Sequence, residues 1–448
     1  MRIGAVVVIV AVGATIAAGS PAGAQTPPPG PPAPMAPAPP SIPGRVLTVD
    51  EAVAIALEGQ PLIQARMADY AAARFRVDQA LAPLLPQITG SWTAARAQSV
   101  STSSVTTALP KSHTVTSWSD PTTAKVSLSQ ILFDFGKNLA ATEAARRSAD
   151  VAAEDVELQR QLITQTVKES YTQIVFAQRL IRVNLQAQER AELNLRSARG
   201  FFDVGTRPKS DVTRAEVDVA NARVDVIRAR GVERVARAAL NTAMGIAANT
   251  PTQVQDNLAY QPVTIDRTQL LPEALRQRPE YKQARLRADA AEASLRQAIR
   301  NYFPDVKGGG FYGATRADMN EIWELNLSLE WSLFDGGGRI AKHREAKAAL
   351  EAAQARVKVS ELDISREVEQ AQVSVTETEE RIQAAQKAVE SAQENFRLAQ
   401  GRFDAGVGTI LELTDAQLAL TLAQNLEAQA LGDYRIALAR LDRAMGRR

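Results

Sequence analysis

Two histidines are the first side chains to weigh as catalysts or metal ligands. His113 lies in a Ser/Thr-rich stretch, and His343 lies in a long segment that lacks glycine and proline. Neither belongs to a pair with metal-ligand spacing, and a solvated surface position is the common role of such residues. The chain has no cysteine, which excludes thiol chemistry and cysteine-ligated metals. The sequence therefore predicts no catalytic residue, no metal site and no cofactor, so we do not expect an enzyme.

Two glycine triplets, Gly308-Gly309-Gly310 and Gly336-Gly337-Gly338, superficially resemble phosphate-binding loops. A P-loop needs the pattern G-x-x-x-x-G-K-[ST], which places a lysine and a hydroxyl beside the backbone N–H groups. That pattern follows neither triplet. The second triplet lies at a predicted strand-to-helix junction, where glycines let the backbone turn. We expect structural glycines and no phosphate binding.

The composition is typical of helices that pack along narrow seams. Of 448 residues, 45% are hydrophobic and only 5% are aromatic, so a single thick core is not expected. The 52 basic and 50 acidic side chains are interleaved and leave a formal charge of +2. Because no basic block stands out, we expect no nucleic-acid partner.

The amino terminus has the pattern of a secretory signal. Arg2 precedes an apolar run at 3–18, and Ala22-Gly23-Ala24 provides an A-x-A cleavage site. We predict a signal peptide over residues 1–24; an uncleaved inner-membrane anchor is the alternative, although the run is short for a span. Residues 25–45 are proline-dense and are expected to be a disordered, extended leader. No other stretch approaches the length of a membrane helix, so membrane insertion would have to use strands.

The chain contains an internal duplication. Leu132-Phe133-Asp134 recurs as Leu333-Phe334-Asp335, and Phe202-Asp203-Val204-Gly205 recurs as Phe403-Asp404-Ala405-Gly406, in both cases 201 residues later. Separated markers with one offset indicate two copies of one unit. We place the first copy at 46–246, an inter-repeat segment at 247–270 and the second copy at 271–448. The first copy is longer before Leu132, and its Ser/Thr-rich run from Ser99 to Ser119 is interpreted as a surface loop.

Each copy is predicted to contain one very long helix. Glycine and proline are absent from Lys137 to Arg199 and from Arg339 to Gln400, and helices of that length extend roughly 90–100 Å at about 1.5 Å per residue. Apolar residues recur every seven positions in the second segment, at Val368, Val375, Ile382, Val389, Phe396 and Phe403. This spacing predicts supercoiled helix packing. A shorter helix is expected after each glycine-containing turn.

Four segments have the pattern of strands: 86–99 and 122–134 in the first copy, and 304–314 and 322–334 in the second. From Trp323 to Leu333, apolar residues alternate with the polar residues Glu324, Asn326, Ser328 and Glu330. The run matches the length of a transmembrane barrel strand, about 9–11 residues. An ordinary half-buried sheet is the alternative. Because four strands cannot close a barrel alone, several chains would have to share one.

In combination these features resemble the TolC-like outer-membrane efflux proteins over nearly the whole mature chain, about Val46 to Arg448. The matching segments are the opening LTVDEAVAIALEGQP, the break LLPQI, the junctions LFDFGKN and LFDGGGR, the turns FDVGTRPKSDV and FDAGVGTILELTDAQ, and the ending YRIALARLDRAMG. Each segment alone is weak evidence. Their duplicated order and consistent spacing make the resemblance specific.

The resemblance implies a mainly α fold with a small β part. Three copies would build a hollow α-barrel in the periplasm, and each would add four strands to a shared twelve-stranded barrel in the outer membrane of a Gram-negative cell. The implied function is a passive exit duct of a tripartite efflux pump or a type I secretion system. The implied partners are a periplasmic adaptor (membrane fusion) protein, an inner-membrane transporter of the RND, ABC or MFS class, and outer-membrane lipid. The sequence indicates neither the cargo nor the transporter class.

The two helix-to-helix turns correspond to the periplasmic tips of this family. The residues then expected to contact the adaptor are Gly205, Thr206 and Pro208 in the first tip, and Gly406, Val407 and Gly408 in the second. Polar links between the tips hold the entrance shut in some relatives. The second tip here lacks arginine, and Arg207 and Lys209 of the first tip are the candidates to replace it.

Three acidic residues follow these turns: Asp211, Glu412 and Asp415. The family carries acids at the matching second-copy positions, where threefold repetition would form a negative ring that concentrates cations at the aperture. Helix capping is the alternative role for Asp211 and Glu412, because Thr409-x-x-Glu412 is a capping box and an acid in the first turn suits the helix dipole.

By the same analogy Glu324, Asn326, Ser328 and Glu330 are expected to face the lumen of the β-barrel. The rival hypothesis is a periplasmic coiled-coil structural or adaptor protein whose strands never enter the membrane. Adaptors normally carry glycine-rich, lipoyl-like halves around a single helical hairpin. Two long hairpins, each preceded by amphipathic strands, favour the channel.

Overall fold

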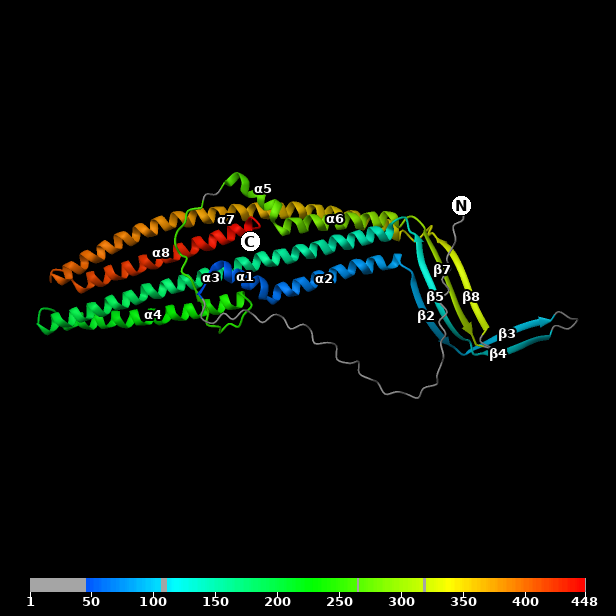
Figure 1. Cartoon of the computed structure of the whole chain (residues 1–448), viewed down its shortest axis with the longest axis horizontal. Coiled ribbons are helices and arrows are strands. Elements are labelled where there is room, and N and C mark those ends of the chain that lie inside the picture. Colours follow the sequence, from blue (N-terminus) through cyan, green and yellow to red (C-terminus); the bar gives the residue numbers. More distant parts are fainter. Residues whose placement is uncertain (1–45, 106–110, 264–265, 317–319, 448) are drawn as a thin grey trace. The chain divides into compact units, whose positions relative to one another are not determined.

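The computed structural model describes residues 46–105, 111–263, 266–316 and 320–447. The predicted signal peptide (1–24) and leader (25–45) lie outside the described residues. The described chain is mainly helical and carries a small antiparallel sheet (Figure 1). The fold class expected from the long glycine-free segments and the short alternating runs is therefore confirmed.

Each copy contributes one long and one shorter helix joined by a tight turn. α3 (Lys137–Asp203) and α7 (Gly338–Asp404) have 67 residues each, and α4 (Lys209–Ala243) and α8 (Ile410–Ala444) have 35 each. The long helices extend roughly 100 Å at about 1.5 Å per residue. Of the helices that the structure describes, none has a stretch long and apolar enough to cross a membrane.

Each long helix is supported by two shorter helices in series. α3 packs on α2 (Pro61–Leu81) near the sheet and on α4 over the rest of its length, while α7 packs on α6 (Pro279–Arg300) and α8 in the same way. α6 and α8 also pack on α3, so the two copies join into one wall of helices (Figure 1).

The supporting helices meet end to end at two joints that need glycine. At the first joint Gly245 has φ +76°, and a Cβ there would lie 3.0 Å from the Cα of Gln60. The Gln60 side-chain amide donates to the carbonyl of Ala243 at 2.9 Å, which satisfies a free carbonyl at the end of α4. At the second joint Gly446 has φ +77°, and a Cβ there would lie 2.9 Å from the backbone N of Arg278.

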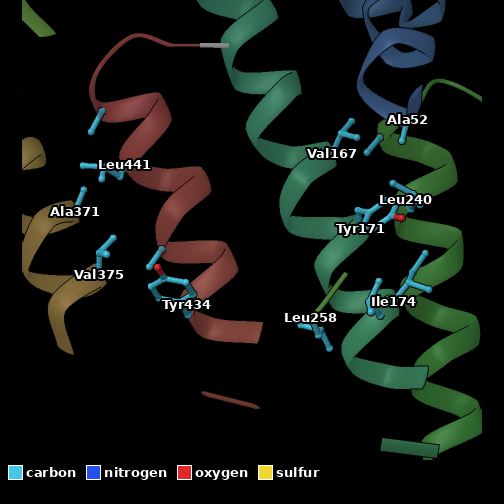
Figure 2. Packing of buried hydrophobic residues seen from close by; sticks show 14 of the residues in the cluster. Ala52, Val167, Tyr171, Ile174, Leu240, Leu258, Ala371, Val375, Tyr434 and Leu441 are labelled. Atoms are coloured by element: carbon cyan, nitrogen blue, oxygen red, sulfur yellow. The ribbon is translucent and has the colours of Figure 1, made fainter. Parts of the chain in front are cut away.

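A waist layer packs over the joints and forms the main hydrophobic core. It contains α1 (Val49–Gly59), α5 (Arg267–Gln277) and the parallel pair β1 (Val46–Leu47) and β6 (Gln253–Val254). Tyr171 of α3 is fully buried, and its hydroxyl donates to the carbonyls of Leu47 and Gln255 at 2.8 Å each. Burial of this phenol raises its pKa to about 12. Figure 2 shows Tyr171 beside Leu240 of α4, with Ala52 of α1 close to Val167.

The sheet has the order β2-β5-β7-β8 and is antiparallel throughout. Its strands are β2 (Gln87–Ala94), β5 (Thr122–Phe133), β7 (Asp305–Thr315) and β8 (Asn320–Glu330). Strands from the two copies are therefore neighbours at the β5–β7 pair.

The loop predicted from Ser99 to Ser119 is wrong. β3 (Ala97–Val105) and β4 (Lys111–Ser119) pair as a second antiparallel ribbon, which continues the first copy beyond the four-stranded sheet. Serine and threonine are common in loops, but threonine and valine favour strands, and hydroxyls can pair across neighbouring strands. The Ser99 and Ser117 hydroxyls lie 2.7 Å apart in such a pair.

The glycine triplets have the structural roles expected of them. Gly310 lies inside β7, where a Cβ would approach the carbonyl oxygen of Glu324 to 2.6 Å. Gly337 has φ +89° and precedes α7. There the Asp335 carboxylate accepts from the backbone N–H groups of Gly337 and Arg339, at 3.2 and 2.9 Å. Asp134 does the same before α3, so the repeated Leu-Phe-Asp motif starts both long helices.

Replacing Gly245 tests the close approach at the first joint. We expect Gly245→Ala to destabilise the fold by roughly 1–3 kcal/mol, because the left-handed backbone and the contact with Gln60 both disfavour a Cβ. Gly231→Ala is the matched control, since this glycine lies within α4 with nothing within 4 Å and alanine favours helix. Thermal unfolding followed by circular dichroism should show a lower melting temperature only for Gly245→Ala; equal melting temperatures would contradict the prediction.

Candidate functional sites

The two hairpin tips are built alike from glycine-terminated helices. Gly205 ends α3 with φ +74° and Gly406 ends α7 with φ +76°. The following residues close the turn, with Thr206 N donating to the Phe201 carbonyl at 2.9 Å and Val407 N to the Arg402 carbonyl at 3.0 Å. This is the Schellman arrangement, which lets two helices reverse in few residues.

The residues predicted to contact an adaptor lie in these turns. Gly205, Thr206, Pro208, Gly406 and Val407 are exposed, and Val407 is 71% exposed although it is apolar. Gly408 differs because it is buried, and a Cβ there would lie 2.9 Å from the backbone N of Phe403. Gly408 therefore serves the packing of the tip.

Arg207 joins the two tips. Its guanidinium donates to the carbonyl of Gly408 at 2.6 Å and lies 4.5 Å from the ring centroid of Phe403. Phe403 is 1% exposed and makes an edge-to-face contact with Phe201. A cation held over aromatic rings and bonded to a carbonyl is well anchored. The first tip thus supplies the arginine that the second tip lacks, while Lys209 is exposed.

The three candidate aperture acids have different surroundings. The Asp211 side chain is 15% exposed and lies 3.7 Å from Arg207. The backbone N–H of Glu412 donates to the Thr409 hydroxyl at 3.1 Å, as a helix cap requires. The Glu412 carboxylate, however, pairs with Arg402 at 3.1 Å, so the capping box predicted for Thr409 and Glu412 is only half formed. Asp415 is exposed and has no ion pair among the residues that the structure describes.

Polar contacts between the hairpins continue above the tips. The Thr414 hydroxyl donates to the Asp218 carboxylate at 3.0 Å, and the Asn194 amide donates to the Gln417 side chain at 2.7 Å. These pairs join residues about 200 positions apart and show no local signal in the sequence, which is why they were not predicted.

The sheet has one polar and one apolar face. Glu324, Asn326, Ser328 and Glu330 share the polar face of β8, where the Asn326 amide donates to Glu324 at 2.9 Å and Lys307 pairs with Glu330 at 2.5 Å. On the other face, cross-strand rows align Ile88, Leu128, Gly310 and Leu325 across all four strands. Leu325 is 84% exposed and Leu327 is 72% exposed. Nothing in the described chain covers this apolar face, which argues against an ordinary half-buried sheet.

Sequence reasoning missed a buried ion cluster at the second helix joint. Arg278 is 3% exposed and contacts Glu367 of α7 at 2.5 Å and Glu280 at 2.9 Å, while Glu280 also pairs with Arg443 of α8. Burial opposes the charge of Arg278, but hydrogen bonds and charges from Glu280 and Glu367 raise the pKa of Arg278 overall. Burial likewise opposes the charge of Glu280, yet Arg278 and Arg443 hold the pKa of this carboxyl below its ordinary value. The position equivalent to Arg278 in the first copy is the neutral Gln60.

A family model described as outer membrane efflux protein matches residues 52–246 and 270–447. The chain belongs to this outer membrane efflux protein family. The two matched segments correspond to the two helical hairpins and the strands that precede them.

Individual relatives agree with the family assignment. The chain is 25% identical over 345 residues to nodulation protein T of Rhizobium leguminosarum bv. trifolii, covering 73% of this chain and 72% of the relative. It is also 25% identical over 409 residues to the alkaline protease secretion protein AprF of Pseudomonas aeruginosa, covering 86% and 82%. The structure of the outer membrane protein VceC of Vibrio cholerae superposes with a TM-score of 0.73 at 20% identity, over 89% of this chain and 96% of that one. This last likeness concerns the fold alone.

Membership of the outer membrane efflux protein family places the chain in the outer membrane and makes it a channel protein, not an enzyme. The rival hypothesis of an adaptor without membrane insertion is thereby excluded.

The ion cluster at the second joint predicts an acid-sensitive stability. The Glu280 carboxyl has a lower pKa in the folded chain than in the unfolded chain. Its carboxylate therefore stabilises the fold at any pH above the unfolded pKa. This stabilisation is lost as the pH falls through the folded pKa. We expect Glu280→Gln to lower the melting temperature by several degrees at pH 7, because Arg278 then loses a buried partner. The difference in melting temperature between Glu280→Gln and the wild type should become smaller below about pH 4.

The control for this titration is Glu351→Gln, which alters an exposed glutamate of α7. Its melting temperature should follow that of the wild type between pH 7 and pH 3.5. A deficit in Glu280→Gln that stays constant across this range would refute the assigned role of the carboxylate.

Proposed function

We propose that three copies of this chain close into a duct that crosses the periplasm and the outer membrane. The duct gives cargo a passive exit and belongs to a tripartite efflux pump or a type I secretion system. Energy for transport would come from an inner-membrane partner, because the family to which the chain belongs is a family of channels.

The observation that carries this proposal is a helical wall with two unlike free edges. Beyond the waist, α4 packs mainly on α3 at one edge, and α7 packs on α8 at the other. Both edge helices expose apolar side chains, among them Val217, Val224 and Val235 on α4 and Val359, Leu362 and Val373 on α7. Two different edges can cover each other only head to tail, which produces a closed ring when the rotation permits.

The edges of the sheet support the same proposal. β2 and β8 are edge strands with free backbone groups, and they are unlike each other. Free edges promote aggregation in water and are not tolerated in lipid, whereas closure of the sheets of several copies removes them. Three copies would provide twelve strands, with Leu325 and its row toward lipid and Glu324, Asn326, Ser328 and Glu330 toward the lumen.

The entrance is proposed to lie at the hairpin tips. The contact of Arg207 with Gly408 and Phe403 holds the two hairpins of one subunit together there. Asp415 is the best aperture acid because its charge is unpaired within the described chain, whereas Arg207 and Arg402 balance Asp211 and Glu412. Threefold repetition of Asp415 would favour cations over anions at the entrance.

The exposed tip residues are the proposed docking surface for a periplasmic adaptor protein, which would connect the duct to an RND, ABC or MFS transporter of the inner membrane. Exposed apolar residues such as Val204 and Val407 are suited to an interface, since water solvates them poorly. The relatives are named for nodulation, pyoverdine export and alkaline protease secretion, so no single cargo follows from similarity.

Placing an arginine on each face of the sheet tests membrane insertion. We expect Leu325→Arg to prevent accumulation of trimers in the outer membrane, because an arginine facing lipid costs about 2–4 kcal/mol near the bilayer midplane. Ser328→Arg, three residues along the same strand and on the polar face, is the control that should insert and assemble. The measurement is the trimer content of outer-membrane extracts, determined by native mass spectrometry. Normal assembly of Leu325→Arg would contradict the assignment of the two sheet faces.

Selectivity at the entrance distinguishes the acids. Asp415→Asn should reduce the preference for cations in planar bilayers, seen as a shift of the reversal potential in a salt gradient of tens of millivolts at most. Glu412→Gln should have a smaller effect, because Arg402 already balances that carboxylate. An equal or larger effect of Glu412→Gln would show that Asp415 does not line the aperture.

A further inference from the structure

Exposed apolar side chains continue from the sheet into the start of the helices. Trp331, Leu333 and Phe334 follow β8 and are 55%, 77% and 87% exposed, and Leu139 in the first turn of α3 is 58% exposed. Large apolar groups at the end of a lipid-facing sheet mark the border of the hydrocarbon layer. In the proposed assembly this border therefore lies where the strands become helices.

An open groove of about 840 Å³ lies next to this border, between α2 and α3. Tyr70, Arg74 and Phe75 line it from α2, and Leu139 and Arg146 line it from α3. Phe75 is 66% exposed, so the groove combines apolar surface with two exposed guanidinium groups. We call these five residues the α2/α3 groove.

The two arginines of the groove are free to bind an anion. Neither Arg74 nor Arg146 has a carboxylate within ion-pair distance in the part of the chain that the structure describes. Glu143 pairs with Arg296 of α6 at 2.9 Å, and Asp150 pairs at 3.7 Å with Arg147, which also lines the groove. Among the described residues Asp78 has no ion pair, so the two unpaired arginines of the groove outnumber its unpaired acids by one charge.

The heptad rows of α3 indicate which side of the wall the groove occupies. Leu139 and Arg146 lie on the row that continues to Val167 and Ile174, where the waist layer buries both side chains. We therefore place the α2/α3 groove on the face of the helical wall that carries the waist layer, because Leu139 and Arg146 share this heptad row. In a closed duct that layer must be outside, because inside it would obstruct the lumen.

The arginines also lie at a suitable depth. Arg146 is about 14 Å along α3 from its start, and Arg74 is about 10 Å from the end of α2, at roughly 1.5 Å per residue. Side chains on α3 lean toward its amino terminus, hence toward the membrane. Lipid headgroups occupy roughly 5–8 Å beyond each side of the hydrocarbon core, and a long arginine side chain extends into that layer.

We propose that the α2/α3 groove binds the headgroup of an anionic phospholipid from the periplasmic leaflet of the outer membrane. Arg74 and Arg146 contact the phosphate, and Phe75 and Leu139 contact the adjoining acyl chains. The inference rests on the proposed function, because it needs the sheet in the membrane and the waist layer outside the ring. Such a lipid would fix the height of each subunit relative to the bilayer.

Native mass spectrometry of the full-length protein tests the site, with titrations of phosphatidylglycerol and, separately, of phosphatidylcholine. We expect the wild type to bind phosphatidylglycerol at least tenfold more tightly than phosphatidylcholine. The double variant Arg74→Gln, Arg146→Gln should bind phosphatidylglycerol at least fivefold more weakly than the wild type. Arg356→Gln is the matched control, since it removes an exposed charge that has no ion pair among the described residues and lies about 27 Å along α7. Unchanged lipid retention in the double variant would overturn the proposal.

Two further arms exclude other occupants. Competition by millimolar inorganic phosphate would show a free-anion site and overturn the choice of lipid. Phe75→Cys, in a chain without native cysteine, should react with a water-soluble maleimide in the lipid-free trimer; protection from the maleimide there would show that a second copy covers the groove. The mass of the assembly in the same spectra separates the two proposals, because a wild type that is not trimeric contradicts the duct, whereas a trimeric double variant without bound lipid supports the groove.

Discussion

A helix of 67 residues has more apolar surface than any one partner helix of this chain can cover, and the rest of the structure follows from that mismatch. Each long helix is covered by two shorter ones that meet end to end. The joints require backbone contact that a side chain would prevent, which accounts for Gly245 and Gly446. The joints also require a layer that holds the ends of the four supporting helices α2, α4, α6 and α8 in place. The waist layer provides this through contacts such as those of the Tyr171 hydroxyl. The hairpins and strands extend from this waist in opposite directions.

The hairpin tips show how a nearly symmetric duplication acquires different chemistry at its two copies. Both turns close with the same hydrogen bonds, but only the first carries an arginine, and that side chain crosses to the second. Asp211 and Glu412 occupy equivalent positions in the two copies, yet each has a different partner. Arg207 balances Asp211, Arg402 balances Glu412, and Asp415 remains unpaired in the described chain.

Much of the fold was predictable from sequence because it depends on local rules. The absence of glycine and proline over two long segments predicted α3 and α7. The constant offset predicted two copies of one unit, and alternation around Glu324 predicted a two-faced strand. The β3–β4 ribbon was missed because serine and threonine suit both loops and strands, and only the register of a partner decides between them. The Arg207 and Arg278 contacts were beyond reach for another reason. They depend on which helix ends meet in space, and residues such as Glu367 and Gly408 carry no mark of that meeting.

The difference between Gln60 and Arg278 has a consequence for any ring made of this chain. The two residues occupy equivalent joints, one neutral and one ionic. Around a ring of three subunits the six joints would alternate between these two kinds. The backbone would then approximate sixfold symmetry while the electrostatics remained threefold. A binding partner that recognises the shape of the helices at the waist would have six equivalent positions. A partner that recognises charge would have three. The stoichiometry of whatever encircles the duct thus depends on which of the two properties it recognises.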